Sequence, residues 1–383
     1  MRALFWISFL GIAYAYVGYP LLLRAIATVT GRQPRPALRE DGDGTLPAVS
    51  VIVPVHNEEA VIAAKLDNLA SLEYPRERLE VFVVSDGSTD RTPDIVRARA
   101  KEGLRLLEVK ERGGKAGALN CGMAHATGDV VCFTDASIML EPGALKALLR
   151  NFDDPTVGCA SGEDVIRAGG GERLYGMYEL GIRRLESAVS SIVGASGSFY
   201  AQRRHLCKEF PEGLAPDFLS VLDTVGRGFR AVTDPSAVGT MTSLHSSRAE
   251  FHRKVRTLLR GMATLRARIG MLNPLRHGLF AVLLFSHKLV RWWVPYFLLA
   301  LFVANAFLAA TPFFAMFLAA QVAFYGLALL AWAGVGVVRD SLPGKVAVYF
   351  TVVNLATLVA WWKFARGVRQ EIWNPTRRES VRP

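Results

Sequence analysis

The sequence predicts an α/β domain with a mostly parallel sheet and helices on both faces, flanked by transmembrane α-helices. Two observations lead to this fold class. From residue 48 onward, strand-like apolar runs alternate with helix-like segments, which is the pattern of a parallel sheet covered by helices. Long apolar runs occupy residues 1–28 and 279–365, whereas residues 40–275 have the composition of an ordinary α/β domain.

Five parts follow from this division of the chain. They are an N-terminal transmembrane anchor (1–28), a cytoplasmic α/β domain (40–247), amphipathic interfacial helices (248–278), a C-terminal transmembrane region of about three segments (279–365) and a basic tail (366–383).

The composition limits which classes of binding partner are expected. The 383 residues are 51% hydrophobic and carry a net charge of +11. A basic chain can bind nucleic acid, an anionic membrane surface or anionic substrates. The sequence contains no recognised nucleic-acid motif, so we expect the lipid bilayer rather than nucleic acid as a partner. The four cysteines lack the spacing of zinc ligands, and we expect reduced thiols.

The N-terminal apolar run, Ala3 to Leu23, has the length of a membrane span, since about 20 residues cross the hydrocarbon core. A cleaved signal peptide is the alternative, but its apolar region usually has only about 7–15 residues. Basic residues follow the run and favour a cytoplasmic downstream side. We therefore expect an uncleaved anchor in the cell (inner or plasma) membrane.

Three further apolar segments are Leu289–Ala310, Pro312–Val337 and Val346–Trp362. Three crossings after a cytoplasmic domain would put the tail outside, whereas the basic residues of the tail favour the inside. One segment could be re-entrant or interfacial, and the sequence leaves the number of spans open.

Residues 248–272 carry apolar side chains at helical spacing and basic side chains on the opposite face, which predicts a basic amphipathic helix. Such a helix suits a membrane surface. It could equally pack on the α/β domain with a solvated basic face.

Four strands are predicted at residues 48–53, 80–86, 104–109 and 129–135. Polar clusters follow or adjoin them: PVHNEE (54–59), DGSTD (86–90), RGGKAGALN (112–120) and TDAS (134–137). A lone DGS would indicate only a turn. Four clusters at the carboxyl ends of one parallel sheet indicate a single ligand site, because ligands bind at that edge.

These motifs, in this order and spacing, resemble the GT-A nucleotide-binding half of family 2 glycosyltransferases, the family of cellulose, hyaluronan and chitin-oligosaccharide synthases. The resemblance covers residues 48–240 and extends to the family's membrane-bound branch. It implies a nucleotide-sugar donor, expected to be a UDP-sugar, and Mg²⁺ or Mn²⁺ as cofactor.

The resemblance also implies roles for the donor-side residues. Asp86 would hold the base or ribose of the nucleotide, and Pro54, Asn57 and Glu58 would line the same pocket. Lys115 would sit at the base or diphosphate.

Asp135 matches the first aspartate of the family's Asp-x-Asp metal motif, whereas Ser137 replaces the second. Mg²⁺ and Mn²⁺ can rely on one or two carboxylates plus substrate phosphates. We therefore predict a metal site at Asp135 and Ser137.

The catalytic base is the next implied role. Asp217 aligns with the second acid of the family's acidic pair, and Pro216 replaces the first. A helix N-cap is the alternative for Asp217, and Asp223 is the fallback base. The upstream segment 194–204 resembles the acceptor side, with Ser196, Gly197 and Ser198 at its turn.

The long-polymer synthases carry Gln-x-x-Arg-Trp after the base, where this chain has Arg253, Arg256 and Thr257. A gapped alignment could favour Arg260 over Arg256. We expect arginines here to clamp the donor diphosphate.

The sequence thus predicts an inverting membrane glycosyltransferase that extends a polysaccharide or oligosaccharide. Two alternatives remain: single-sugar transfer to a lipid-linked acceptor, and a catalytically weak nucleotide-binding subunit of a polysaccharide export complex. A partner subunit is possible, and the sequence leaves open whether one is needed. Ser137 and Pro216, each replacing an acid, are the features that favour the weak subunit.

Overall fold

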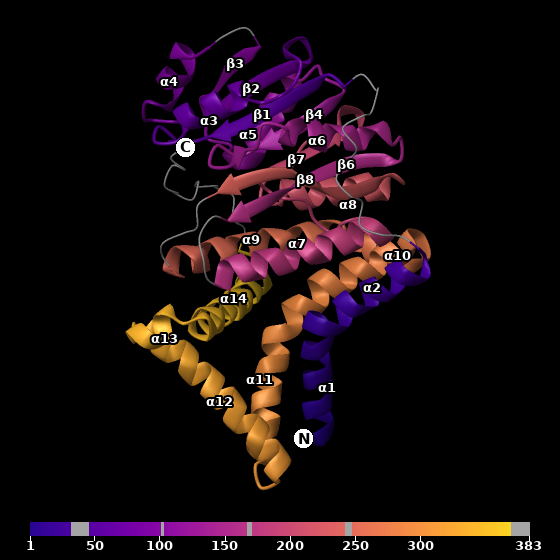
Figure 1. Ribbon diagram of the computed structural model, residues 1–383, viewed down its shortest axis with the longest axis vertical. Coiled ribbons are helices and arrows are strands. Elements are labelled where there is room, and N and C mark those ends of the chain that lie inside the picture. The colour runs from indigo at the N-terminus through magenta and orange to yellow at the C-terminus, as the bar shows by residue number, and fades with distance from the viewer. Residues whose placement is uncertain (32–45, 101–102, 167–170, 242–246, 369–383) are drawn as a thin grey trace.

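The computed structural model describes residues 1–31, 46–100, 103–166, 171–241 and 247–368. Figure 1 shows three layers along the long axis: a sheet domain, a pair of long helices beneath it, and a set of apolar helices below these. The two long helices thus lie between the sheet and the apolar helices.

One eight-stranded sheet forms the first layer, in the order β3-β2-β1-β4-β7-β6-β8-β5. The strands β1, β2, β3 and β4 pair in parallel, and β7 runs antiparallel between β4 and β6. The mostly parallel sheet is confirmed, and the four predicted strands match β1 to β4 within two residues. The strand bounds are β1 Val49–Val55, β2 Leu79–Asp86, β3 Leu104–Val109, β4 Val130–Thr134, β5 Met139–Leu140, β6 Val157–Ile166, β7 Phe199–Arg203 and β8 Arg230–Met241.

Helices cover both faces of this sheet. Val51, Val53 and Val81 point into one core, which α3, α4 and α6 close, and Ile52 and Phe82 point into the other, which α5, α7 and α8 close. This alternation is the period of two that a strand buried on both faces requires. The helix bounds are α3 Ile62–Ala70, α4 Thr92–Ala98, α5 Gly114–His125, α6 Ala144–Arg150, α7 Gly171–Val189 and α8 Pro216–Gly226. Short 3₁₀ turns lie at Arg76–Arg78, Asn151–Asp153, Arg204–Leu206 and Ile269–Leu272.

The amphipathic helix is α9 (Ser247–Ala267), and it lies with α7 in the second layer. Its apolar residues Val255, Leu259, Met262 and Leu265 are buried. Its basic residues do not all face solvent or lipid, since several enter the pocket described below.

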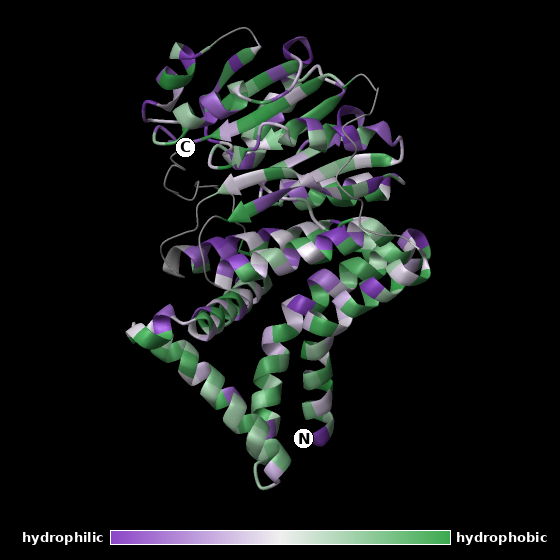
Figure 2. Cartoon of the chain, viewed as in Figure 1, coloured by the Kyte–Doolittle hydropathy of each residue, from purple (hydrophilic) through white to green (hydrophobic). Residues whose placement is uncertain are grey.

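Four helical stretches are long and apolar enough to cross a membrane: Arg2–Val29, Pro274–Leu308, Pro312–Trp332 and Leu342–Ala365. Figure 2 shows the apolar residues on the helices of the third layer, away from the sheet. These stretches comprise α1 (Arg2–Ala13), the π-helix η1 (Tyr14–Gly18) and α2 (Tyr19–Val29); α10 (Pro274–Leu284), the π-helix η6 (Phe285–Val290) and α11 (Arg291–Leu308); α12 (Pro312–Trp332); and, after α13 (Gly336–Asp340), α14 (Leu342–Ala365).

The last of these helices, α14, does not follow the direction of the others. Near its start Tyr349 packs against Tyr175 of α7, and near its end the Trp361 indole donates to the carbonyl of Trp292 at the top of α11. Both ends of α14 thus contact helices on the side of the sheet domain, as Figure 1 shows.

Candidate active site

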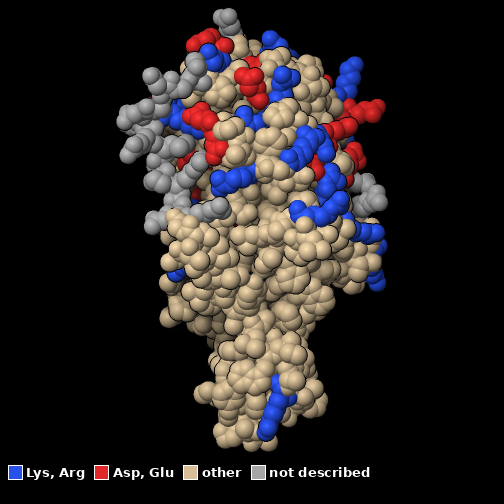
Figure 3. All heavy atoms as spheres, turned by 90° about the vertical axis from the view of Figure 1, so that its right-hand side faces the viewer, with Lys and Arg blue, Asp and Glu red and all other residues tan. Residues whose placement is uncertain are grey.

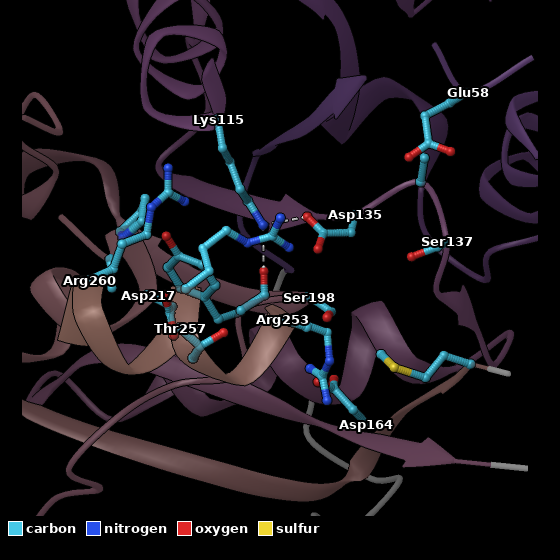
Figure 4. A pocket seen from close by; sticks show the side chains of 17 residues that line it. Glu58, Lys115, Asp135, Ser137, Asp164, Ser198, Asp217, Arg253, Thr257 and Arg260 are labelled. Carbon is cyan, nitrogen blue, oxygen red and sulfur yellow. Dashed lines mark hydrogen bonds and ion pairs between the residues drawn. The ribbon is translucent and has the colours of Figure 1, made fainter. Parts of the chain in front are cut away.

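A pocket lies where the sheet edge meets α9 (Figure 4). Nine of the residues singled out in the sequence line it: Glu58, Lys115, Asp135, Ser137, Gly197, Ser198, Asp217, Arg253 and Arg256. They come from the ends of β1 and β4, the start of α5, the segment before β7, the start of α8 and one face of α9. The fold therefore brings both predicted halves, donor side and acceptor side, to one cavity.

An ion pair marks the donor end of the pocket. The Lys115 ammonium donates to Asp135 Oδ1 at 2.5 Å and to the Gly197 carbonyl at 2.9 Å. Lys115 therefore lies beside Asp135, the predicted metal ligand. Glu58 lies on the same side, where burial, followed by the charges of Asp135 and Asp90, raises its pKa to about 7.

The segment Ser196–Ser198 joins the two ends of the pocket. The Ser198 carbonyl accepts from the backbone N–H of Asp135 at 3.0 Å. On the other side, a Cβ built on Gly197 would lie 3.7 Å from the Asp217 carboxyl carbon. Ser196 itself is buried, and its hydroxyl donates to Asp164 at 2.6 Å. The predicted acceptor-side turn is thus central to the site.

Asp217 is the second residue of α8, and Ala215 occupies the N-cap. The N-cap alternative for Asp217 is therefore wrong. Burial raises the pKa of Asp217, which suits a general base, while Lys115 and Lys288 act to lower it. The fallback residue, Asp223, is bound to Arg268 at 2.8 Å and does not line the pocket.

Three arginines on one face of α9 close the pocket. Arg253 is bound to Glu250 at 2.8 Å and to Glu172 at 3.3 Å. Arg260 lies near Asp217, and its Nε is buried without a hydrogen-bond partner. Burial lowers the pKa of Arg256 and of Arg260, yet both guanidinium groups stay charged at neutral pH. Both alignments considered for the arginine motif thus place a cation in the pocket.

Three predicted donor residues lie outside this lining. Asp86, at the end of β2, accepts the Gly113 N–H at 2.8 Å through Oδ1, while its Oδ2 is buried without a partner. Asn57 has φ 53°, and its side chain accepts the Thr89 N–H at 2.8 Å. Pro54 is buried within β1. These residues tie the first two polar loops together beside the pocket.

Sequence reasoning missed Asp164, Tyr200 and Met241, which also line the pocket. They lie on β6, β7 and β8, the half of the sheet that contains antiparallel pairs. No sequence motif marks these residues. Their strands reach the site because β7 pairs antiparallel with both β4 and β6, which a local pattern does not reveal.

The model of glycosyl transferase family 2 matches residues 50–209. The chain contains a family 2 glycosyltransferase domain. This match includes the Asp86, Lys115 and Asp135 motifs and the acceptor-side turn, whereas Asp217 and the arginines of α9 lie after it.

Similar proteins extend the comparison beyond the family 2 domain. A mannosyltransferase from Pyrobaculum calidifontis, solved with GDP-mannose and Mn²⁺, is 28% identical with a TM-score of 0.73, and the match covers 94% of this chain and 99% of that one. This likeness supports the GT-A fold of the sheet domain, and its coverage includes most of the apolar helices.

Curated relatives match over a shorter region. A β-monoglucosyldiacylglycerol synthase from Nostoc is 39% identical over 119 residues, which is 30% of this chain and 25% of the relative. A poly-β-1,6-N-acetyl-D-glucosamine synthase from Staphylococcus aureus is 30% identical over 124 residues, which is 32% of this chain and 30% of the relative. The matched region therefore spans less than a third of either relative.

The family 2 domain offers few protein ligands for a divalent cation. Among the described residues, no group of three His, Cys, Asp or Glu side chains is arranged to hold a metal ion. Asp135 and Ser137 nevertheless both line the pocket and supply oxygen atoms. This donor set fits Mg²⁺ or Mn²⁺, which keep waters and take further oxygens from substrate phosphates.

Proposed function

We propose that this protein is an inverting membrane glycosyltransferase that moves a sugar from a nucleoside-diphosphate sugar to a membrane-proximal acceptor. One observation carries the proposal: a partly buried carboxylate, Asp217, lies across the Ser196–Ser198 segment from the Lys115–Asp135 pair. A base for the acceptor and a charged end for the donor diphosphate thus share one pocket.

The reaction follows from these positions. Asp217 accepts the proton of an acceptor hydroxyl, and the oxygen attacks the anomeric carbon on the face opposite the leaving diphosphate. Lys115, Arg256 and Arg260 stabilise the negative charge that develops on the diphosphate. A divalent cation held by Asp135 and Ser137 would supply further charge stabilisation at the same oxygens.

Two donor classes deserve testing. The family resemblance favours UDP-sugars, whereas the solved mannosyltransferase that matches most of this chain holds GDP-mannose. Asp86, with one carboxylate oxygen free of protein partners, is the candidate contact for the base or ribose. Pro54, Asn57 and Glu58 remain proposed neighbours of the nucleotide.

The arrangement of the helices supports a lipid-linked or other membrane-anchored acceptor. A polysaccharide needs a channel enclosed by several spanning helices, and within the described chain only α1, α11 and α12 run away from the sheet domain (Figure 1). Extension of a polysaccharide, as the relative from Staphylococcus aureus is named for, is the second candidate. A cytoplasmic catalytic domain, a cell-membrane location and a partner subunit remain parts of the proposal.

Sugar transfer by detergent-purified protein tests the function. UDP-glucose, UDP-N-acetylglucosamine, UDP-galactose and GDP-mannose are offered with Mg²⁺ or Mn²⁺ and membrane lipid extract as acceptor. We expect one donor to turn over, and Asp217→Asn to reduce transfer about 10²- to 10⁴-fold, as expected for loss of a general base.

Asp135→Ala should abolish the dependence on metal, and Asp223→Asn is the matched control that should retain transfer once its folding is verified. A wild-type protein that binds nucleotide but turns over none of the donors would favour the non-catalytic subunit. Full activity of Asp217→Asn would refute the assignment of the base.

A further inference from the structure

Two π-helical turns meet where the membrane helices leave the sheet domain. They are η1, within the N-terminal helix, and η6, between α10 and α11. The hydroxyls of Tyr14 and Ser286 join them at 2.7 Å. Such turns are rare and frequently lie at functional sites. This junction lies outside the pocket lining.

A buried network fixes the orientation of η6 against α7. Glu186 of α7 accepts the Tyr19 hydroxyl at 2.5 Å and lies 2.5 Å from His287 Nδ1. The other ring nitrogen of His287 lies 3.2 Å from Glu179, which also pairs with Arg291 at 2.5 Å. His287 and Arg291 are one helical turn apart, so both hold the same face of η6 and α11 against α7.

Lys288 is the next residue of η6 and therefore points in another direction, since successive helical residues lie on different faces. Its ammonium lies 5.2 Å from the centre of the Phe218 ring and 3.5 Å from where a Cβ on Gly194 would sit. Phe218 follows Asp217 directly, and Lys288 and Asp217 interact electrostatically.

Three carboxylates act on the Lys288 ammonium, and the effect of Asp217 is smaller than those of Glu179 and Glu186. Glu179 and Glu186, however, are bound to Arg291, His287 and Tyr19. In the described part of the chain, Lys288 has neither a hydrogen bond nor an ion pair of its own.

We propose that Lys288 is a positioning residue for catalysis: its ammonium keeps the Asp217 carboxylate ionised and oriented toward the acceptor, and the glutamates of α7 hold the π-turn that presents it. The inference rests on the proposed role of Asp217 as base. It assigns a specific task to the membrane helix, which supplies a charge to the active site.

The other groups that face Asp217 are Lys115 from α5, Arg260 from α9, Tyr200 from β7 and Cys159 from β6. Burial raises the pKa of Asp217, and the cations around it oppose that rise. Removing Lys288 should therefore raise this pKa further, so that the base ionises only at higher pH.

The first test is the pH profile of transfer, with the donor that turns over in the screen and Mn²⁺. For Lys288→Met we expect the acid limb of kcat/KM to move up by about one pH unit, the size of shift that one nearby opposite charge produces. Lys288→Arg should restore the wild-type profile. Lys363→Met, the same change in the last turn of α14, is the control and should leave the profile in place.

The second test needs no substrate. Infrared difference spectra of the full chain are recorded during an acid titration, and the signal of Asp217 is isolated by subtracting Asp217→Asn. The midpoint should rise in Lys288→Met and in Lys288→Gln, a second variant in case the first does not fold, and should return in Lys288→Arg.

The outcomes separate the two proposals. If Asp217→Asn keeps full transfer, the base assignment fails, and the role of Lys288 fails with it. If Asp217 is essential but its midpoint is the same in wild type and Lys288→Met, the inference about Lys288 alone is overturned. A fall in activity without any shift in pH would indicate a merely structural lysine.

Discussion

At the scale of single residues, Ser137 is the most informative departure from the family motif. It lines the pocket on the loop that follows β4, and the side chain of Lys65 is hydrogen-bonded to this loop. The Lys65 ammonium donates to the Thr134 hydroxyl at 3.0 Å and to the Ile138 carbonyl at 2.7 Å. The loop is thus held at both ends, so residue 137 keeps its place when its side chain changes.

Ser137→Asp should tighten Mn²⁺ binding about tenfold or more, because a second carboxylate adds charge beside Asp135 in an oxygen site. Mn²⁺ titration followed by electron paramagnetic resonance, in the presence of the donor nucleotide, measures the affinity. Ser137→Asn is the matched control, of similar shape to aspartate but without the charge. Equal affinity in all three proteins would mean that residue 137 does not ligate the metal.

At the scale of elements, the contact between α7 and η6 depends on buried charges. Burial by itself would raise the pKa of Glu179, but Arg291 and His287 outweigh this effect and hold the pKa below its usual range. Ionised Glu179 therefore stabilises the fold at pH values above the ordinary pKa of glutamate. This stabilisation is lost as the pH falls through the lowered pKa of the folded state.

Glu179→Gln should lower the free energy of unfolding by about 3–5 kcal/mol, because it leaves the buried Arg291 without a charged partner. Thermal unfolding in detergent at neutral pH is the measurement. Tyr19→Phe, which removes one hydrogen bond to Glu186, should cost only about 1 kcal/mol. A similar loss in both variants would show that the ion pair contributes little beyond a hydrogen bond.

The sequence predicts some elements better than others. The apolar runs of β1 to β4 are unambiguous because a strand buried on both faces has few polar residues. The start of α3 at Ile62 is less predictable, because the backbone N–H groups of Glu58 and Glu59 before it donate to Thr92 and Asp90, in and just after the DGSTD loop. Such long-range bonds cannot be read from a local pattern.

The candidate site was predictable where motifs mark it and not elsewhere. Asp135, Lys115 and Asp217 are carried by recognisable segments and reach one pocket. No sequence motif marks Asp164 or Lys288. Each lies on an element, β6 or η6, that only tertiary packing brings close to the site. The helical periodicity of α9 alone predicts a basic face toward solvent or membrane, whereas the resemblance to the synthase motif predicts arginines at the donor. Arg253, Arg256 and Arg260 line the pocket, as the motif predicts.

At the scale of the whole molecule, the distribution of charge and the directions of the helices both bear on which helices cross the membrane. On the face that Figure 3 shows, the charged side chains gather on the upper part of the molecule, and the lower part carries very few. The loop between α11 and α12 (309–311) contains no charged residue. We propose that only α11 and α12 cross the bilayer after the sheet domain and that α14 stays on the side of that domain, which would resolve the conflict noted in the sequence.

This arrangement predicts that residue 366 lies on the same side of the membrane as the catalytic domain. In a background with Cys121→Ser and Cys207→Ser, Arg366→Cys should react with an impermeant maleimide from the side that labels Cys121 in the wild type. Thr311→Cys should react from the opposite side. Labelling of Arg366→Cys together with Thr311→Cys would mean that α14 crosses the bilayer.

The arginines of α9 limit where this enzyme can be truncated to give an active soluble fragment. A soluble fragment ending at residue 247, where composition alone would cut it, would retain Asp135 and Asp217 but lose all three arginines of the pocket and Lys288. Two of the three cations proposed to stabilise the diphosphate, Arg256 and Arg260, belong to α9, which joins the sheet domain to the apolar helices. Lipid thickness or detergent choice would then act on turnover directly, through the position of α9, and not only through access of the acceptor.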